Sequence, residues 1–198
     1  PRHIRVIFSR ITPKRKRWKE FSSPRSSGDF FSESLAIYCK LLYDRGMEDK
    51  KFALLIDADN TSSKYIKTIV DEITNLGITT YRRIYGDWTS TNLQSWKAIL
   101  LEYSITPMQQ YGYTTGKNST DSAMIIDAMD ILYAGNVDGF CLVSSDSDFT
   151  KLAMRLREAG KTVVGMGKEQ TPRPFVAACN QFKYLDLLSK EGEEEKAA

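Results

Sequence analysis

Two short acidic turns, each following an apolar run, contain the residues of this sequence best suited to chemistry. Residues 139–143 are followed by SSDSD at 144–148, and residues 52–56 are followed by DADN at 57–60. Carboxylates held close together raise one another's pKa, so buried strands that end in acid pairs need a cation or protons nearby. Both turns are therefore candidate parts of one acidic site.

A fifth carboxylate, Asp121, opens a helix predicted over 121–134. If the strands that precede the two acidic turns are neighbours, Asp57, Asp121, Asp146 and Asp148 converge in one cleft. Hard oxygen ligands without His or Cys favour Mg²⁺ or Mn²⁺. Such an ion lowers the pKa of a bound water and orients it on a phosphodiester. These residue types therefore predict metal-assisted hydrolysis of a phosphate ester.

Several of these aspartates also have a purely structural interpretation. Asp59 and Asn60 could form an Asx turn that leads into the next helix. Asp121 and Asp148 could complement the positive end of a helix dipole. Asp127 lies six residues after Asp121, about 600° around the helix, so it need not share a ligand role with Asp121.

Apolar runs and helical patterns alternate along the chain from residue 52 onward. The predicted strands are 52–56, 78–85, 105–110, 139–144 and 161–166, and the predicted helices are 62–76, 91–103, 121–134 and 147–159, with a weaker helix and strand up to 188. This alternation predicts an α/β fold, a Rossmann-like three-layer sandwich with a mostly parallel central sheet. Ligands of such sheets bind outside the carboxyl ends of the strands, where both acidic turns fall.

The charge of the chain is unevenly placed. The 198 residues carry a formal charge of +3, but residues 1–46 hold 11 of the 28 basic and 4 of the 25 acidic residues. The remainder, with 17 basic and 21 acidic residues, has a charge of −4. Broad electrostatic attraction to nucleic acid is therefore not expected of the folded part.

We expect three segments along the chain. Residues 1–46 have no sustained hydrophobic period and are interpreted as a basic, disordered extension: a nucleic-acid arm, an Arg/Ser-rich transit peptide, or a segment outside the native protein. We favour the last, because Met47 leads directly into the first strand as a natural start would. The folded domain is expected over 47–188, followed by an acidic tail over 189–198.

Histidine and cysteine usage excludes several classes of site. The only histidine, His3, lies in the basic segment, which excludes His-centred triads and disfavours zinc chemistry. Three cysteines show no C-x-x-C spacing, and Cys141 falls within a predicted strand. Reduced thiols and a cytoplasmic location are therefore expected. No apolar run approaches the roughly 18 residues of a membrane span, so no membrane association is predicted.

Candidate substrate contacts lie near the acidic turns. Lys117, in a glycine-bracketed loop four residues before Asp121, could contact a substrate phosphate, although a solvated loop lysine is equally compatible. Ser144 and Ser145 precede the second acid pair, and Lys168 and Arg173 lie near the end of a predicted strand. These five are the candidate substrate-binding residues; the basic ones could follow a nucleic-acid backbone.

Weaker candidates lie on the predicted strand 78–85 and in loops at the carboxyl edge of the sheet. Arg82 and Arg83 could also contact phosphates. Trp88, Tyr111 and Tyr113, in loops at the carboxyl edge, could stack on unpaired bases. Aromatic residues in such loops are more often packing residues.

Five sequence blocks resemble, in their order, the NYN domain of the LabA-like branch of the PIN-domain nucleases. The blocks are LIDADN (55–60), YGDW (85–88), GKNSTD (116–121), VSSDSDF (143–149) and GMG (165–167). The resemblance covers about residues 51–188. It implies a Rossmann-like, PIN-like parallel sheet and a ribonuclease site that uses Mg²⁺ or Mn²⁺.

The same motif match implies roles for individual residues. By the resemblance, Asp57, Asn60, Asp121, Asp146 and Asp148 are the catalytic residues. Asp57, Asp121 and Asp146 are expected to hold the metal, while Asn60 and Asp148 orient waters. Single-stranded RNA is the expected partner. Relatives often carry a winged-helix RNA-binding module of the LOTUS (OST-HTH) type, so a longer native chain or a partner could supply one.

Two other functions compete with this interpretation. DADNT at 57–61 also fits the D-x-D-x-T pattern of haloacid-dehalogenase-like phosphatases, with Asp57 as nucleophile and Asp59 as acid–base. That class needs room for a cap and gives the block at 116–121 no role. The other alternative is a module that binds RNA or protein without catalytic activity. Such modules lose their activity by losing the acidic residues, and this chain retains those residues.

Overall fold

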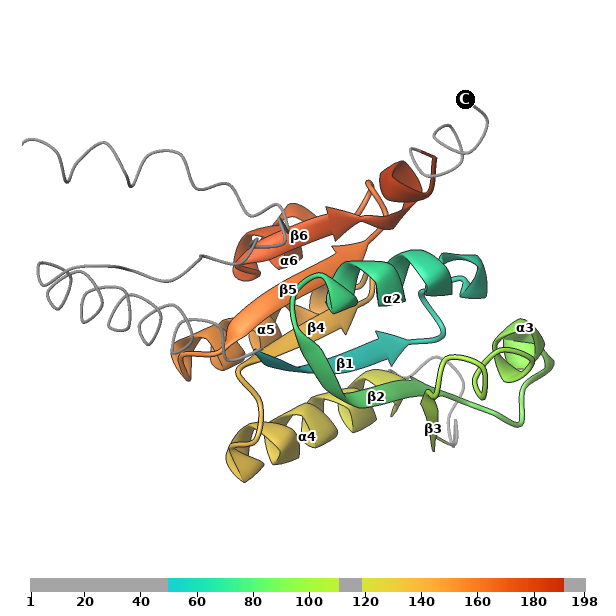
Figure 1. Ribbon diagram of the computed structural model, residues 1–198, viewed down its shortest axis with the longest axis horizontal. Helices are drawn as coiled ribbons and strands as arrows, with labels where there is room; N and C mark the ends of the chain where they lie inside the picture. The colour runs from blue at the N-terminus through green and yellow to red at the C-terminus, as the bar shows by residue number, and fades with distance from the viewer. Residues whose placement is uncertain (1–49, 111–118, 191–198) are drawn as a thin grey trace, which may run out of the picture. The chain divides into compact units, whose positions relative to one another are not determined.

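The computed structural model describes residues 50–110 and 119–190. Within them, one six-stranded sheet has the order β3-β2-β1-β4-β5-β6, and every neighbouring pair of strands is parallel. The strands are β1 (Lys51–Asp57), β2 (Ile78–Gly86), β3 (Thr106–Gln109), β4 (Gly139–Val143), β5 (Thr162–Gly167) and β6 (Gln181–Tyr184). The predicted α/β fold with a parallel central sheet is confirmed (Figure 1).

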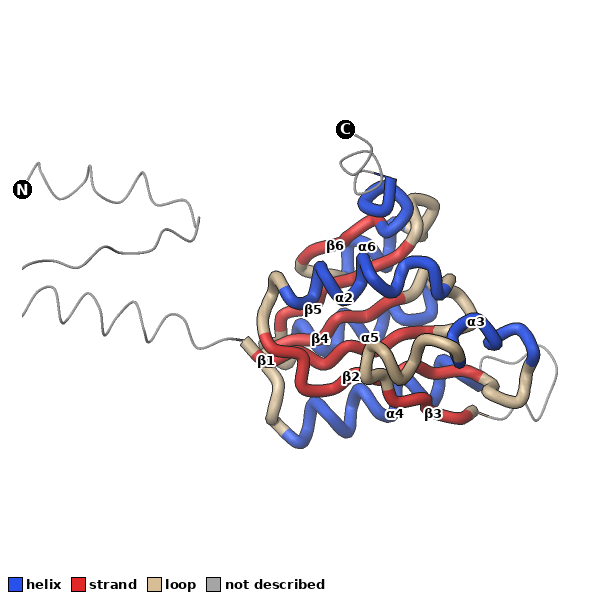
Figure 2. The backbone as a smooth tube through the Cα atoms, turned by 45° about the vertical axis from the view of Figure 1, so that its right-hand side comes forward, coloured by secondary structure: helices blue, strands red, loops and turns tan. Residues whose placement is uncertain are grey.

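Helices cover both faces of the sheet and complete three layers (Figures 1 and 2). They are α2 (Ile66–Thr74), α3 (Gln94–Lys97), α4 (Ser119–Ala134), α5 (Thr150–Glu158) and α6 (Arg173–Ala178), with short 3-10 turns η2 (Ser63–Tyr65), η3 (Thr91–Leu93) and η4 (Ser147–Phe149). Helices α2 and α3 pack on one face, and α4, α5 and α6 pack on the other. A further helical segment occupies 185–190.

The central strands are apolar over residues 52–56 of β1 and over the whole of β4, because both of their faces are covered. Ala53 and Leu55 of β1 belong to the core cluster under α4, α5 and α6, whereas Leu54 and Ile56 belong to the cluster under α2 and α3. These four residues are all 0% exposed. Continuous apolar runs are typical of parallel strands buried on both sides.

The order of the strands reverses between β1 and β4. Ile56 of β1 pairs with Val143 of β4, and on the other side Asp57 pairs with Tyr85 of β2. From β1 the chain continues outward through β2 and β3, and it later returns to β4 on the opposite side of β1. The acidic turns that follow β1 and β4 therefore meet at the switch point of the sheet, where doubly wound folds bind their ligands.

Helix α3 is shorter than the apolar pattern indicates. The pattern predicts a helix over 91–103, but regular helix extends only over Gln94–Lys97 after the η3 turn. Beyond it, the backbone N–H groups donate to carbonyls both three and four residues back, so the regular ladder is lost. The segment then turns into β3 through Ser104, whose φ of 52° lies in the left-handed region.

Three predicted features lie outside the described residues: the extension at 1–46, the loop that contains Lys117, and the last eight residues of the acidic tail. None of the helices within 50–110 and 119–190 combines the length and apolar character needed to cross a membrane.

Candidate acidic active site

Asp57, the last residue of β1, is completely buried and accepts four hydrogen bonds. Its Oδ1 accepts from the backbone N–H groups of Asp59 (3.1 Å) and Asn60 (3.3 Å). Its Oδ2 accepts from Asn60 Nδ2 (2.7 Å) and from the Ser144 hydroxyl (2.7 Å). An ionised carboxylate offers about four lone-pair positions, so these four bonds account for the acceptor capacity of Asp57.

Ser144 and Ser145 connect three loops at the carboxyl edge of the sheet. The buried Ser144 hydroxyl, which donates to Asp57, also accepts from the backbone N–H of Asp146 at 3.0 Å. The Ser145 hydroxyl accepts from the backbone N–H of Lys168, at the end of β5, also at 3.0 Å. Both serines were predicted substrate contacts. In the structure their hydroxyls fix the loops that carry the acidic residues.

Gly167 allows the end of β5 to approach this turn closely. A Cβ atom at Gly167 would lie 2.7 Å from the Ser144 carbonyl oxygen and 3.0 Å from the Ser145 hydroxyl. Any larger residue would push these two strand ends apart. The glycine is therefore required by packing against the second acidic turn.

Three carboxylates form what we call the acidic cluster, namely Asp121, Asp146 and Asp148. One oxygen from each lies within 4.8 Å of the other two. Asp121 is in the first turn of α4 and is 8% exposed, while Asp146 precedes η4 as its N-cap. Asp146 Oδ1 accepts from the backbone N–H of Asp148 at 2.9 Å, which holds the latter two residues together.

Burial and repulsion from neighbouring carboxylates raise the pKa of Asp121 and of Asp57. Burial, followed by repulsion from Asp57, Asp146 and Asp148, raises the pKa of Asp121 to about 6. Burial also raises the pKa of Asp57, although the hydrogen bonds from Ser144 and Asn60 act in the opposite direction. A divalent cation would relieve this repulsion, and a set of carboxylate oxygens suits Mg²⁺ or Mn²⁺. The residues present therefore fit such an ion.

The structure brings the predicted catalytic residues together, but it groups them differently from the predicted ligand set. Asp121 and Asp146 lie in the acidic cluster as expected, and their companion there is Asp148 instead of Asp57. Asp57 lies next to the cluster and is linked to it through Ser144. Asn60 donates to Asp57 with both its backbone and its side chain. No sequence pattern indicated the bridging position of Ser144.

The basic residues of β2 do not contact the site. Arg83 forms an ion pair with Asp127 of α4, which also accepts from the Tyr85 hydroxyl. Arg82 donates to the Tyr103 carbonyl at 3.1 Å. Both arginines therefore contact the fold itself, and the suggestion that they follow a nucleic-acid backbone stays a prediction. Asp127 pairs with Arg83 and Tyr85, and its separation from the ligand role of Asp121 stays a prediction.

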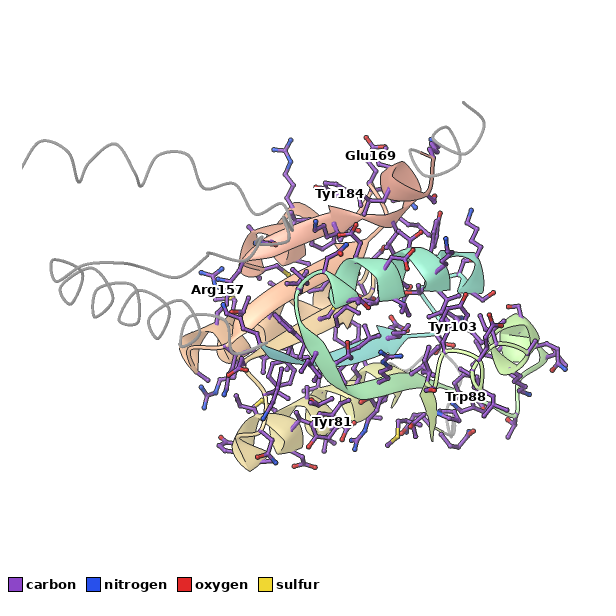
Figure 3. All side chains as sticks on the ribbon, viewed as in Figure 1. Tyr81, Trp88, Tyr103, Arg157, Glu169 and Tyr184 are labelled. Atoms are coloured by element: carbon purple, nitrogen blue, oxygen red, sulfur yellow. The ribbon has the colours of Figure 1, made fainter. Side chains whose placement is uncertain are left out.

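Trp88 is a packing residue. Its indole N–H donates to the Met108 carbonyl at 3.0 Å, and its ring packs against the core under α2 and α3. In Figure 3, Trp88 and Glu169 lie at the end of the sheet toward which the strands point, whereas Arg157 lies at the opposite end.

Arg173, one of the predicted substrate-binding residues, is the first residue of α6, and it is exposed.

A pocket of about 470 Å³ adjoins the turn after β1. Asp59 and Asn60 line it on one side and Lys168 on another, together with residues of η3 and α3 such as Asn92 and Ser95. Of the predicted substrate-binding residues, Lys168 alone lines this pocket within the described part of the chain. The contribution of Asn92 and Ser95 has no recognisable signal in the sequence, because it depends on how η3 and α3 pack against the turn.

Comparisons with known proteins agree with this architecture. The model of the NYN domain family matches residues 51–186. The uncharacterized protein MJ0482 of Methanocaldococcus jannaschii is 24% identical over 171 residues, which cover 83% of this chain and 67% of that protein. The crystal structure of VPA0982, a protein of unknown function from Vibrio parahaemolyticus, is similar with a TM-score of 0.59 and 19% identity, over 70% of this chain and 94% of that chain.

The structural similarity concerns the fold alone, whereas the family match covers the strands and turns that carry every described acidic residue of the site. Placement in the LabA-like branch stays a prediction. The chain belongs to the NYN domain family, which is part of the PIN-like superfamily.

Proposed function

We propose that this protein is a metal-dependent ribonuclease that hydrolyses RNA phosphodiester bonds. The observation that carries the proposal is the acidic cluster, whose three oxygens approach within 4.8 Å at the switch point of a parallel sheet. Membership of a family within the PIN-like nucleases supports the reaction class. RNA as the substrate and Mg²⁺ or Mn²⁺ as the metal both belong to the proposal.

Asp121, Asp146 and Asp148 would hold the Mg²⁺ or Mn²⁺ ion. When bound, such an ion supplies positive charge at the reacting phosphate and lowers the pKa of a coordinated water. Asp121, with a pKa of about 6, releases its proton at neutral pH and can then serve as a ligand. Asp146 is oriented by the backbone N–H of Asp148, which presets the arrangement of the second acidic turn.

Asp57 and Asn60 would position the site from the side of β1. Four hydrogen bonds fix the Asp57 carboxylate, and one of them, from Asn60 Nδ2, fixes the orientation of the Asn60 amide. A fixed amide bonded to Asp57, which Ser144 links to the acidic cluster, supports the predicted role of Asn60 in orienting water. Asp57 contributes negative potential to the cluster, as its effect on the pKa of Asp121 indicates.

The environment of Asp57 argues against the phosphatase alternative. A nucleophilic aspartate must reach the phosphorus atom of its substrate. Asp57 is 0% exposed, and hydrogen bonds account for its acceptor positions.

We infer that the partner is single-stranded RNA and that the protein acts in the cytoplasm. The free, buried thiols of Cys141 and Cys179 support a reducing compartment. Because residues 47–198 carry a charge of −4, an RNA-binding module of the LOTUS type, in a longer native chain or in a partner, would strengthen binding to RNA.

Cleavage of end-labelled single-stranded RNA tests this proposal. We expect product ladders with Mn²⁺ or Mg²⁺ and none with chelator at the same ionic strength. Asp146→Asn, purified in parallel, should lack the activity and so exclude a contaminating nuclease. Equal cutting by wild type and Asp146→Asn would contradict the proposal.

A further inference from the structure

The pocket beside the turn after β1 is lined mainly by polar residues around a small apolar floor. We call it the Trp96 pocket. Its floor is formed by Ala58, Leu93 and Trp96, which are 4%, 3% and 2% exposed. Exposed amide and hydroxyl side chains form the rim, among them those of Asn92 and Ser95. At about 470 Å³, it falls within the roughly 300–1,000 Å³ of small-molecule sites.

Hydrogen bonds tie the Trp96 pocket to both acidic turns. The Trp96 indole N–H donates to the Thr61 carbonyl at 3.1 Å, and Thr61 directly follows Asn60 in the turn after β1. On the other side, the backbone N–H of Lys168 donates to the Ser145 hydroxyl at 3.0 Å, and Ser145 directly precedes Asp146. These two hydrogen bonds fix the position of the pocket relative to the two acidic turns.

The charge of the pocket limits the number of phosphates that it can accept. Among the described residues that line it, Lys168 and Asp59 are the charged ones. One cation opposite one carboxylate suits a single phosphate group and disfavours a di- or triphosphate, whose additional charges would face Asp59. A neutral sugar would leave Lys168 without an anion. An apolar ligand would leave the amides and hydroxyls of the rim without hydrogen bonds.

A nucleotide meets these requirements in all its parts. Leu93 and Trp96, at 3% and 2% exposed, offer the base a small apolar contact, and the polar edge of the base can hydrogen-bond to the amides and hydroxyls of the rim. The hydroxyls of a ribose can bond to rim amides such as Asn92, and its phosphate can pair with Lys168.

Asn60 lines the pocket and donates to Asp57, which Ser144 links to the backbone of Asp146 in the acidic cluster. A nucleotide in the pocket is therefore connected to the cluster through this chain of hydrogen bonds.

We propose that the Trp96 pocket binds one nucleotide of the RNA strand, the one adjacent to the phosphodiester that is presented to the acidic cluster. This inference rests on the proposed ribonuclease function and adds to it the position of a substrate residue. A free nucleoside monophosphate has the same chemistry as a nucleotide within RNA, so the test must distinguish the two.

Binding is measured first, without metal, so that cleavage plays no part. The full chain in chelator is titrated with uridine monophosphate, and the Trp96 indole N–H is followed by ¹H–¹⁵N NMR, with Trp96→Phe identifying its signal. We expect a saturable shift. Lys168→Ala should weaken binding about tenfold, the usual effect of losing a hydrogen bond to a charged group. Lys67→Ala, on the exposed face of α2, makes the same charge change and should have no effect.

A second variant fills the pocket. Ser95 is exposed on α3, so Ser95→Phe should leave the fold intact, as its thermal unfolding will verify, and should abolish nucleotide binding. Asp146→Asn should bind the nucleotide as wild type does, because it alters the acidic cluster and leaves the pocket unchanged. The failure of nucleotide binding and the failure of cleavage are thereby observed separately.

The position of the pocket on RNA is tested with a short oligouridylate. We expect it to compete with the monophosphate for the same signal. We also expect Lys168→Ala and Ser95→Phe to raise the KM for its cleavage. Absence of the NMR shift, or wild-type KM in both variants, would overturn the inference while leaving the ribonuclease proposal intact. A monophosphate that binds without competition from the oligouridylate would also overturn it, since the pocket would then take free nucleotide.

Discussion

The hydroxyl of Ser144 donates a 2.7 Å hydrogen bond to Oδ2 of Asp57, and this bond joins the two acidic turns of the protein. Both residues are 0% exposed. The same hydroxyl accepts from the backbone N–H of Asp146, so one small side chain sets the distance between the end of β1 and the turn after β4. The acidic cluster depends on this buried contact.

Ser144→Ala should lower the free energy of unfolding by about 1 to 3 kcal/mol, because the buried Asp57 carboxylate loses one of its four hydrogen bonds and the backbone N–H of Asp146 loses its acceptor. Urea unfolding measures the change. Ser147→Ala is the matched control, since Ser147 is exposed in the same turn, and it should change stability by less than about 0.5 kcal/mol. Equal effects of the two substitutions would contradict the bridging role of Ser144.

Asp121 should make the stability of the metal-free protein depend on pH. Its pKa is raised from 3.8 to about 6 in the folded state, so the folded protein binds its proton more tightly than the unfolded chain does. The free energy of unfolding should therefore fall as the pH rises from about 4 to about 6.

Asp121→Asn should reduce this pH dependence, to which the raised pKa of Asp57 also contributes, and should stabilise the metal-free protein at pH 7 by about 1 to 2 kcal/mol. Unfolding in chelator across this pH range is the measurement, and Asp130→Asn, an exposed change on the same helix, is the control. A wild-type slope in Asp121→Asn would show that Asp121 does not carry the raised pKa.

Metal binding should require the acidic cluster. Asp148→Asn should weaken Mn²⁺ binding at least about tenfold in isothermal titration calorimetry at pH 7.5, since it removes one of three neighbouring carboxylates. Binding by the wild type should also weaken below about pH 6, where Asp121 takes up a proton. Asp71→Asn, exposed on α2, should bind as the wild type does. Wild-type affinity in Asp148→Asn would remove Asp148 from the metal site.

Asp127 should stabilise the fold without contributing to metal binding. Asp127→Asn removes the ion pair with Arg83 and weakens the contact with Tyr85, so we expect a loss of about 1 to 3 kcal/mol in urea unfolding. The Mn²⁺ affinity of the folded variant should be unchanged. A loss of Mn²⁺ affinity at unchanged stability would mean that Asp127 belongs to the site.

The parts of the structure that could be predicted from sequence are those set by local pattern. The runs 52–56 and 139–143 are apolar at every position because both faces of β1 and β4 are covered, which makes them recognisable as central strands. The acids at their ends then fall at the carboxyl edge of the sheet by topology alone. Gly135, with a φ of 72°, ends α4 where the pattern predicts its end.

The parts that could not be predicted depend on contacts between distant segments. Asp57 and Asp148 each belong to an Asp-x-Asp pair that follows a central strand, yet hydrogen bonds occupy Asp57 while Asp148 joins the cluster. Arg83 is paired across 44 residues with Asp127, a contact that no local pattern encodes. The predicted helix over 91–103 ends early because the chain must turn into β3.

The central claim is that the acidic cluster gives the protein its ribonuclease activity, and one comparison of cleavage rates tests it most directly. The rate on one end-labelled RNA is measured with saturating Mn²⁺ for wild type, Asp148→Asn and Asp127→Asn. We predict that Asp148→Asn loses nearly all activity while Asp127→Asn, at a temperature where it is folded, cleaves at close to the wild-type rate. Retained activity in Asp148→Asn, or no cleavage by wild type with Mn²⁺ bound, would contradict the account.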